Sequence, residues 1–113
     1  MPPKSQIIFI ADTHGTKPLK NYGPYCATKA GLISLCKSLA KELAPSIRVN
    51  CLSPGTVLPQ ENASPDAIKR AAQRSLLGKV GTPEDLVNGL FFLLNNDYIT
   101  GFDLVIDGGR SLT

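Results

Sequence analysis

Three short runs of apolar residues along the chain predict β-strands. Residues 7–11 read Ile-Ile-Phe-Ile-Ala without a polar position, which is typical of a strand covered on both faces in a parallel sheet. Residues 47–52 (Ile-Arg-Val-Asn-Cys-Leu) and residues 103–106 (Asp-Leu-Val-Ile) have similar compositions, and each is followed by a turn that contains glycine. We therefore expect a sheet of about three strands.

The segments between these strands have helical periodicity. Residues 24–43 carry one apolar stripe, made of Leu32, Cys36, Leu39 and Leu43 with Ile33 and Ala40 beside it. Two further helices are expected over residues 64–77 and 82–95, because both segments begin with a capping hydroxyl, a proline and an acidic residue. The apolar residues expected on one side of the last helix are Leu86, Val87, Leu90, Phe91 and Leu94.

The resulting order of elements, strand-helix-strand-helix-helix-strand, predicts an α/β fold. Such an alternation is typical of a parallel sheet with right-handed crossovers and helices on both faces. Residues 57–64 are expected to form an irregular loop, since they contain proline and asparagine. A length of 113 residues with 42% hydrophobic side chains allows one core.

Composition and charge exclude several classes of protein. The net charge is +3 and the lysines are scattered, so we expect no nucleic-acid partner. No apolar run reaches the roughly 18 to 20 residues that cross a bilayer, and no signal peptide is recognisable, so a cytoplasmic protein without a membrane partner is expected. Cys26, Cys36 and Cys51 lack CxxC spacing and accompany a single histidine, so we expect no disulfide framework and no metal site.

Tyr25 and Lys29 are the first candidates for chemistry. They stand four positions apart at the start of the first expected helix, so the phenol and the ammonium lie on one face, a turn apart. A nearby cation and the positive end of a helix both favour phenolate, which is expected to lower the tyrosine pKa from about 10 toward neutrality. Such a pair suits general acid–base catalysis.

The context of this pair resembles the short-chain dehydrogenase/reductase family. The resemblance is carried, in order along the chain, by the strand at residues 7–11, Tyr25-Cys-Ala-Thr-Lys29, Ile47-Arg-Val-Asn-Cys-Leu-Ser-Pro-Gly55, Tyr98-Ile-Thr-Gly101 and Val105-Ile-Asp-Gly-Gly109. It covers essentially the whole chain and matches only the C-terminal half of the family. It implies the C-terminal part of a doubly wound, Rossmann-type sheet, with Tyr25 as acid–base catalyst and Lys29 binding the nicotinamide ribose.

The resemblance also implies the other parts of a cofactor site. Pro54, Gly55, Thr56 and Val57 resemble the segment that borders the nicotinamide, and Asp107-Gly108-Gly109 resembles a strand end that commonly packs at a subunit interface. No GxGxxG, TGxxxGxG or GxxxxGK[ST] motif occurs in these residues. Residues 1–113 are therefore expected to form a single partial domain that lacks the Gly-rich dinucleotide-binding half.

Asp12 departs from the usual family pattern. The family commonly has a serine thirteen positions before the tyrosine, where it binds the substrate carbonyl, and a carboxylate cannot donate that hydrogen bond. Asp12, Arg110 and the closing Ser-Leu-Thr resemble the pteridine reductase branch, which includes dihydromonapterin reductases and has an aspartate at this site. The alternative for Asp12 is a loop-forming carboxylate that bonds the backbone of Thr13 or His14.

These features predict NADPH-dependent reduction of a pterin-like substrate by hydride transfer, with Asp12, Tyr25 and Lys29 as the catalytic residues. Two alternatives stay open: a non-catalytic fragment or assembly partner, and a carbonyl reductase of the 3-oxoacyl type. Catalysis by His14 and a reactive Cys26 are weaker hypotheses, because an isolated histidine is usually a surface residue and a small thiol usually packs. A bare edge on the first strand predicts a homo-oligomer or association through that edge.

Overall fold

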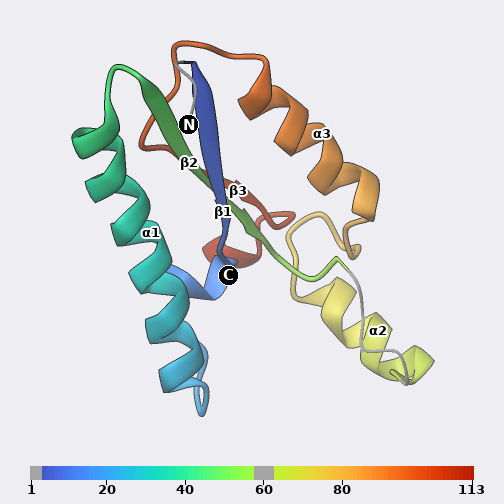
Figure 1. The fold of residues 1–113 in the computed structure, drawn as a ribbon. Coiled ribbons are helices and arrows are strands. Elements are labelled where there is room, and N and C mark those ends of the chain that lie inside the picture. Colours follow the sequence, from blue (N-terminus) through green and yellow to red (C-terminus); the bar gives the residue numbers. More distant parts are fainter. Residues whose placement is uncertain (1–3, 58–62) are drawn as a thin grey trace.

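Three parallel strands form the sheet at the centre of the molecule. The structure, a computed structural model, describes residues 4–57 and 63–113. The strands are β1 (Ser5–Ile10), β2 (Ile47–Pro54) and β3 (Asp103–Ile106), arranged in the order β1-β2-β3 (Figure 1). Ser5 pairs with Ile47 at one end of the sheet, and Pro54 pairs with Ile106 at the other. All three predicted strands and their parallel arrangement are confirmed.

The helices cover both faces of this sheet, as the order of elements predicts. α1 (Gly23–Leu43) lies on one face and α3 (Pro83–Leu94) on the other, while α2 (Pro65–Gln73) lies beyond the end of β2 (Figure 1). Single 3-10 turns, Thr13–Gly15 and Arg110–Leu112, follow β1 and β3. Most of the expected loop at residues 57–64 lies outside the described residues. Among the described helices, none combines the length and apolarity that a membrane crossing needs.

The helix starts follow the predicted capping chemistry. The Ser64 hydroxyl accepts a hydrogen bond from the Ala67 N–H, and Thr82 and Asp85 form a reciprocal capping box at the start of α3. The predicted helix over residues 64–77 ends earlier, at Gln73, and Gly78 adopts a positive φ of 72°. α2 buries no side chain, so no tertiary contact extends it beyond its local signals.

The core on the α1 side is built from small and β-branched residues. Its buried members are Ala11, Ile33, Cys36, Ala40, Val49 and Cys51. Of the expected stripe, Cys36 is buried in this core, whereas Leu32, Leu39 and Leu43 are partly buried at its margin. Ile33 and Ala40, which were expected beside the stripe, are also buried. The small side chains at Cys36 and Ala40 bring the helix close to β2, and the larger leucines fit better at its flanks.

The buried face of α3 differs from the predicted one. Gly89 and Leu93 are its buried residues, whereas Val87, Phe91 and Leu94 are exposed. A Cβ on Gly89 would overlap the Ile106 Cδ1, so the missing side chain lets α3 lie close to the sheet. Because α3 is apolar around most of its circumference, its sequence does not select one face.

A buried asparagine ties the sheet to the loop that precedes β3. Asn50 is fully buried, and its Oδ1 accepts a hydrogen bond of 3.0 Å from the Phe102 N–H. Its Nδ2 donates to the Ile99 carbonyl at 3.0 Å, as does the guanidinium of Arg48. These bonds satisfy polar groups that burial would otherwise leave unpaired, and they fix the entry into β3.

The outer edge of β1 has no partner strand within the described part of the chain, as expected. Ile10, at the end of this edge strand, is 52% exposed. An unpaired apolar edge recruits other chains. We expect the chain at tens of micromolar to sediment well above its monomer mass of 12.1 kDa, and Ile10→Lys to shift it toward the monomer.

Leu112→Lys is the matched control for this experiment. Leu112 is 79% exposed in the last 3-10 turn, so the same change of charge occurs away from the β1 edge. We expect this variant to sediment like the unmodified chain. A compact monomer of the unmodified chain at that concentration would show that the β1 edge does not associate.

Candidate active site

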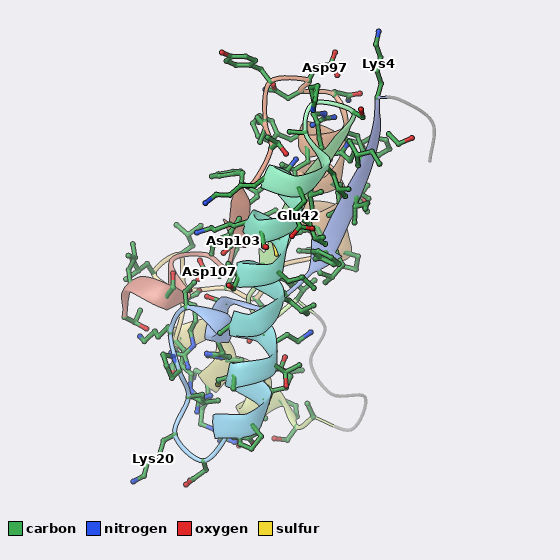
Figure 2. All side chains as sticks on the ribbon, turned by 60° about the vertical axis from the view of Figure 1, so that its left-hand side comes forward. Lys4, Lys20, Glu42, Asp97, Asp103 and Asp107 are labelled. Carbon is green, nitrogen blue, oxygen red and sulfur yellow. The ribbon has the colours of Figure 1, made fainter. Side chains whose placement is uncertain are left out.

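The candidate site lies where the three strands end. Because parallel strands present their carboxyl ends at one edge of the sheet, the residues after β1, β2 and β3 meet there. These residues are Asp12 with Thr13, Gly55 with Thr56, and Asp107. Asp103 and Asp107 mark the two ends of β3, and Asp107 is the one at this edge (Figure 2).

Asp12 and Tyr25 are in direct contact. The Tyr25 hydroxyl donates a hydrogen bond of 2.9 Å to the Asp12 Oδ2, across the thirteen-residue separation noted in the sequence. The other oxygen, Oδ1, accepts a bond of 2.8 Å from the His14 N–H and caps the turn at Thr13–Gly15. The interpretation of Asp12 as a loop-forming carboxylate is confirmed, and its second oxygen contacts Tyr25.

The protonation of Tyr25 is opposite to the expected one. Burial, the hydrogen bond to Asp12 and the negative charge of Asp12 raise the pKa of Tyr25 to about 12. The expected lowering by Lys29 and the helix terminus is wrong for the protein without ligands, because a phenol that donates to a carboxylate is stabilised in its neutral form. At neutral pH Tyr25 is therefore a proton donor.

Lys29 lies beside the phenol as its spacing predicts. Its ammonium is 5.8 Å from the centroid of the Tyr25 ring, within the range of a cation–π contact. Among the described residues the ammonium makes no hydrogen bond and no ion pair, so its three donors are open to a ligand.

The two weaker candidates have structural surroundings. The Nδ1 of His14 lies 3.0 Å from the Lys17 carbonyl, which it bonds when that nitrogen is protonated. Cys26 is buried, and its sulfur accepts from the Leu19 N–H at 3.4 Å. All three cysteines are free and buried, and burial raises the pKa of the Cys51 thiol to about 12. The imidazole of His14 and the thiol of Cys26 make no hydrogen bond to Asp12 or to the Tyr25 hydroxyl among the described residues.

The segment expected to border a nicotinamide follows β2. Pro54 ends the strand, and the Gly55 N–H bonds the Ile106 carbonyl at 2.9 Å. A Cβ on Gly55 would stand 2.7 Å from the Asp107 Cβ, so glycine is required where these strand ends approach. Thr56 is exposed, and Val57 is half-buried beside Gly81.

Thr56 also borders a separate cavity of about 240 Å³. Lys79, Asp85 and Asn88 line its polar side. Asp12, Tyr25 and Lys29 do not line this cavity. The structure therefore brings Asp12, Tyr25 and Lys29 together, while Thr56 stands apart from them at the same edge of the sheet.

Two residues that support the site, Thr13 and Asp107, were not predicted as site residues. Thr13 is buried to 1% exposure, and its Oγ1 donates a hydrogen bond of 2.6 Å to the Asp107 Oδ2. In the sequence, each of them stands in a turn that follows an expected strand, and nothing there shows that they meet. A buried hydroxyl next to Asp12 is recognisable once the fold places the strand ends together.

A parallel sheet with helices on both faces and polar residues at its carboxyl edge defines a Rossmann-type α/β protein. The family whose sequence model matches residues 1–111 is described as enoyl-(acyl carrier protein) reductase. The chain belongs to the short-chain dehydrogenase/reductase family, as its motifs indicate, and it matches the C-terminal half of the relatives.

Three relatives illustrate the similarity. The 2,5-dichloro-2,5-cyclohexadiene-1,4-diol dehydrogenase LinX of Sphingobium indicum is 39% identical over 94% of this chain and 44% of its own length. Carbonyl reductase family member 4 of Xenopus laevis is 39% identical over 94% of this chain and 45% of its own length. The structure of FolM alternative dihydrofolate reductase 1 from Brucella canis, complexed with NADP, superposes with a TM-score of 0.90 at 28% identity and covers 98% of this chain and 44% of that protein. The chain thus spans less than half the length of these relatives.

Proposed function

We propose that this chain is the proton-delivering half of an NADPH-dependent oxidoreductase that reduces a pterin of the dihydropterin or dihydrofolate type. Residues 1–113 are then one partial domain, and activity requires a glycine-rich half that binds the pyrophosphate. The contact between the Tyr25 hydroxyl and the Asp12 Oδ2 carries the proposal. The similarity to FolM, solved with NADP, supports both the substrate class and the cofactor.

The residues present fit one end of a nicotinamide dinucleotide. The Lys29 ammonium has open donors beside the Tyr25 ring, and these suit the hydroxyls of a ribose. Pro54, Gly55, Thr56 and Val57 follow β2 at the same edge, where they would border the nicotinamide. When bound, the cofactor supplies the hydride. The chain has no glycine-rich turn for the pyrophosphate, so this half alone provides an incomplete site.

Asp12 gives the site a preference for substrates that carry hydrogen-bond donors. A pterin ring presents N–H and amino groups that can donate to a carboxylate, whereas a simple ketone offers only acceptors. A donor that binds the Asp12 Oδ2 competes with the Tyr25 hydroxyl and frees the phenol to donate its proton to a ring nitrogen. Because the pKa of Tyr25 is about 12, the phenol retains this proton at neutral pH.

A carbonyl reductase of the 3-oxoacyl type is the second candidate. The similarity to a carbonyl reductase at 39% identity favours it, and it would use the same Tyr25 and Lys29. Asp12 argues against it, because the substrate carbonyl would face a carboxylate where it needs a donor. A non-catalytic assembly partner is the remaining alternative, and the unpaired β1 edge is the feature that favours it.

The proposal is tested by joining the amino-terminal half of Brucella FolM in front of Ser5. We expect the chain alone to bind NADPH with a dissociation constant on the order of 100 μM or weaker, since pyrophosphate contacts are missing. We expect the chimera to bind at low micromolar concentration and to reduce dihydropterin in an NADPH oxidation assay.

The outcomes separate the candidate functions. A folded chimera that binds NADPH but reduces only a 3-oxoacyl thioester would favour the carbonyl reductase. A folded chimera that binds NADPH and reduces neither substrate would favour the assembly partner. Low-micromolar binding of NADPH by the chain alone would show that a phosphate site exists within these residues.

A further inference from the structure

The carboxyl ends of the two outer strands are linked by one partly buried hydrogen bond. The Thr13 hydroxyl, on the residue directly after Asp12, donates to the Asp107 Oδ2 at 2.6 Å. Ninety-four positions separate these residues in sequence, and β2 lies between their strands in the sheet. The bond therefore spans the edge of the sheet at which Asp12 and Tyr25 meet.

Asp107 is a fixed anchor for this bond. Its Oδ1 accepts a hydrogen bond of 2.9 Å from the Gly109 N–H, and its Oδ2 accepts another of 2.9 Å from the Ser111 N–H. Burial raises the pKa of Asp107, but the donors from Thr13, Ser111 and Gly109 outweigh it and the pKa is lowered. The close backbone of Gly55 restricts the side chain from another direction. A carboxylate with this many donors has one favourable orientation.

Thr13 transmits this restraint to Asp12. It is the first residue of the turn that Asp12 caps, and its carbonyl accepts from the N–H groups of Thr16 and Lys17 at 3.2 and 3.1 Å. The Asp12 carbonyl accepts from the Gly15 N–H at 2.9 Å. With Thr13 held at both its side chain and its backbone, the carboxylate of Asp12 keeps one position relative to α1.

We infer that Thr13 and Asp107 are positioning residues that hold the Asp12 carboxylate against the Tyr25 hydroxyl. The inference rests on the proposed function, because it assigns these residues to the same proton-transfer site. Neither residue touches the phenol, so they act through Asp12. Besides burial, Asp12 and Cys26 raise the pKa of Tyr25, and the Lys29 ammonium lies 5.8 Å from the ring centroid.

Tyrosine spectroscopy of the chain itself tests this inference. The chain has three tyrosines and no tryptophan, so replacing the exposed Tyr22 and Tyr98 with phenylalanine leaves Tyr25 as the only reporter. A phenol that donates to a carboxylate has quenched emission at pH 7. The ionisation of Tyr25 is followed by the absorbance of the phenolate. A pKa of about 12 predicts that roughly a tenth of Tyr25 is phenolate at pH 11.

Four variants in this background isolate the role of the hydroxyl. Thr13→Val keeps the shape of the buried side chain and removes its donor, and Thr13→Ala is a second donor-free variant in case valine does not fold. Thr13→Ser restores the donor, and Ser38→Ala removes an exposed hydroxyl from α1, away from this turn. Asp12→Ala removes the acceptor and so gives the Tyr25 emission and pKa of a phenol without this hydrogen bond. Circular dichroism confirms that each variant is folded.

We expect Thr13→Val to raise the Tyr25 emission toward the Asp12→Ala value. A fall of one unit in the Tyr25 pKa would raise the phenolate fraction at pH 11 about fivefold, to roughly one half. Thr13→Ser and Ser38→Ala are expected to match the background. A folded Thr13→Val or Thr13→Ala variant whose Tyr25 signals are unchanged would overturn the inference. These measurements need neither cofactor nor substrate, so they can fail or succeed independently of the chimera assay.

Discussion

Replacing Tyr25 with phenylalanine in the FolM chimera is expected to lower kcat for dihydropterin reduction by a factor of about 10² to 10⁴. The Tyr25 hydroxyl donates to the Asp12 Oδ2, and phenylalanine keeps the ring while it removes this hydroxyl and its proton. Binding of NADPH should change little, because the Lys29 ammonium remains. The measurement is steady-state NADPH oxidation, together with a fluorescence titration of the cofactor.

Tyr22→Phe is the matched control for this prediction. Tyr22 lies three positions earlier and is exposed, and its side chain makes no hydrogen bond among the described residues. The same chemical change there should leave kcat within about twofold, as is usual for a surface substitution. If Tyr25→Phe retained full activity, the proton would have to come from another group, and the proposed site would be wrong.

Replacing Asp12 with serine is expected to shift the substrate preference of the chimera from dihydropterin to ketone. The change removes an acceptor for the pterin N–H groups and introduces a hydroxyl that can donate to a carbonyl. A hydrogen bond to a charged group contributes about 1.5–3 kcal/mol, so the ratio of kcat/KM for dihydropterin over a 3-oxoacyl thioester should fall by roughly 10- to 100-fold or more.

The control for the change of charge is Asp97→Ser. Asp97 is an exposed aspartate near the far end of the sheet (Figure 2). Its replacement should leave the substrate ratio unchanged. An Asp12→Ser chimera that kept its preference for dihydropterin would show that Asp12 serves only to cap the turn after β1, through its bond to the His14 N–H.

The sequence predicted the elements of this fold well because their signals are local. Short runs rich in apolar residues identified the three strands, and capping residues identified the helix starts at Ser64 and Thr82. The packing faces were less predictable. α3 is apolar around most of its surface, and the close approach at Gly89 selects the buried side. That approach depends on β2 and β3, which are distant in sequence.

In the candidate site, too, some features were predictable from the sequence and others were not. The spacing of Tyr25 and Lys29, and the offset of thirteen positions from Asp12 to Tyr25, predicted which side chains meet. The protonation of Tyr25 was not predictable from spacing. It depends on burial, on the hydrogen bond to Asp12 and on the charge of Asp12, all of which raise the pKa of Tyr25.

The sequence by itself determined the strands, the helix starts and the family, because each is encoded in contiguous residues or in fixed spacings. Only the tertiary structure decided that Thr13 and Asp107 join across the sheet, that Tyr25 is a neutral donor, and which face of α3 is buried. These features depend on distances between residues far apart in sequence, which exist only after the strands have aligned their carboxyl ends at one edge.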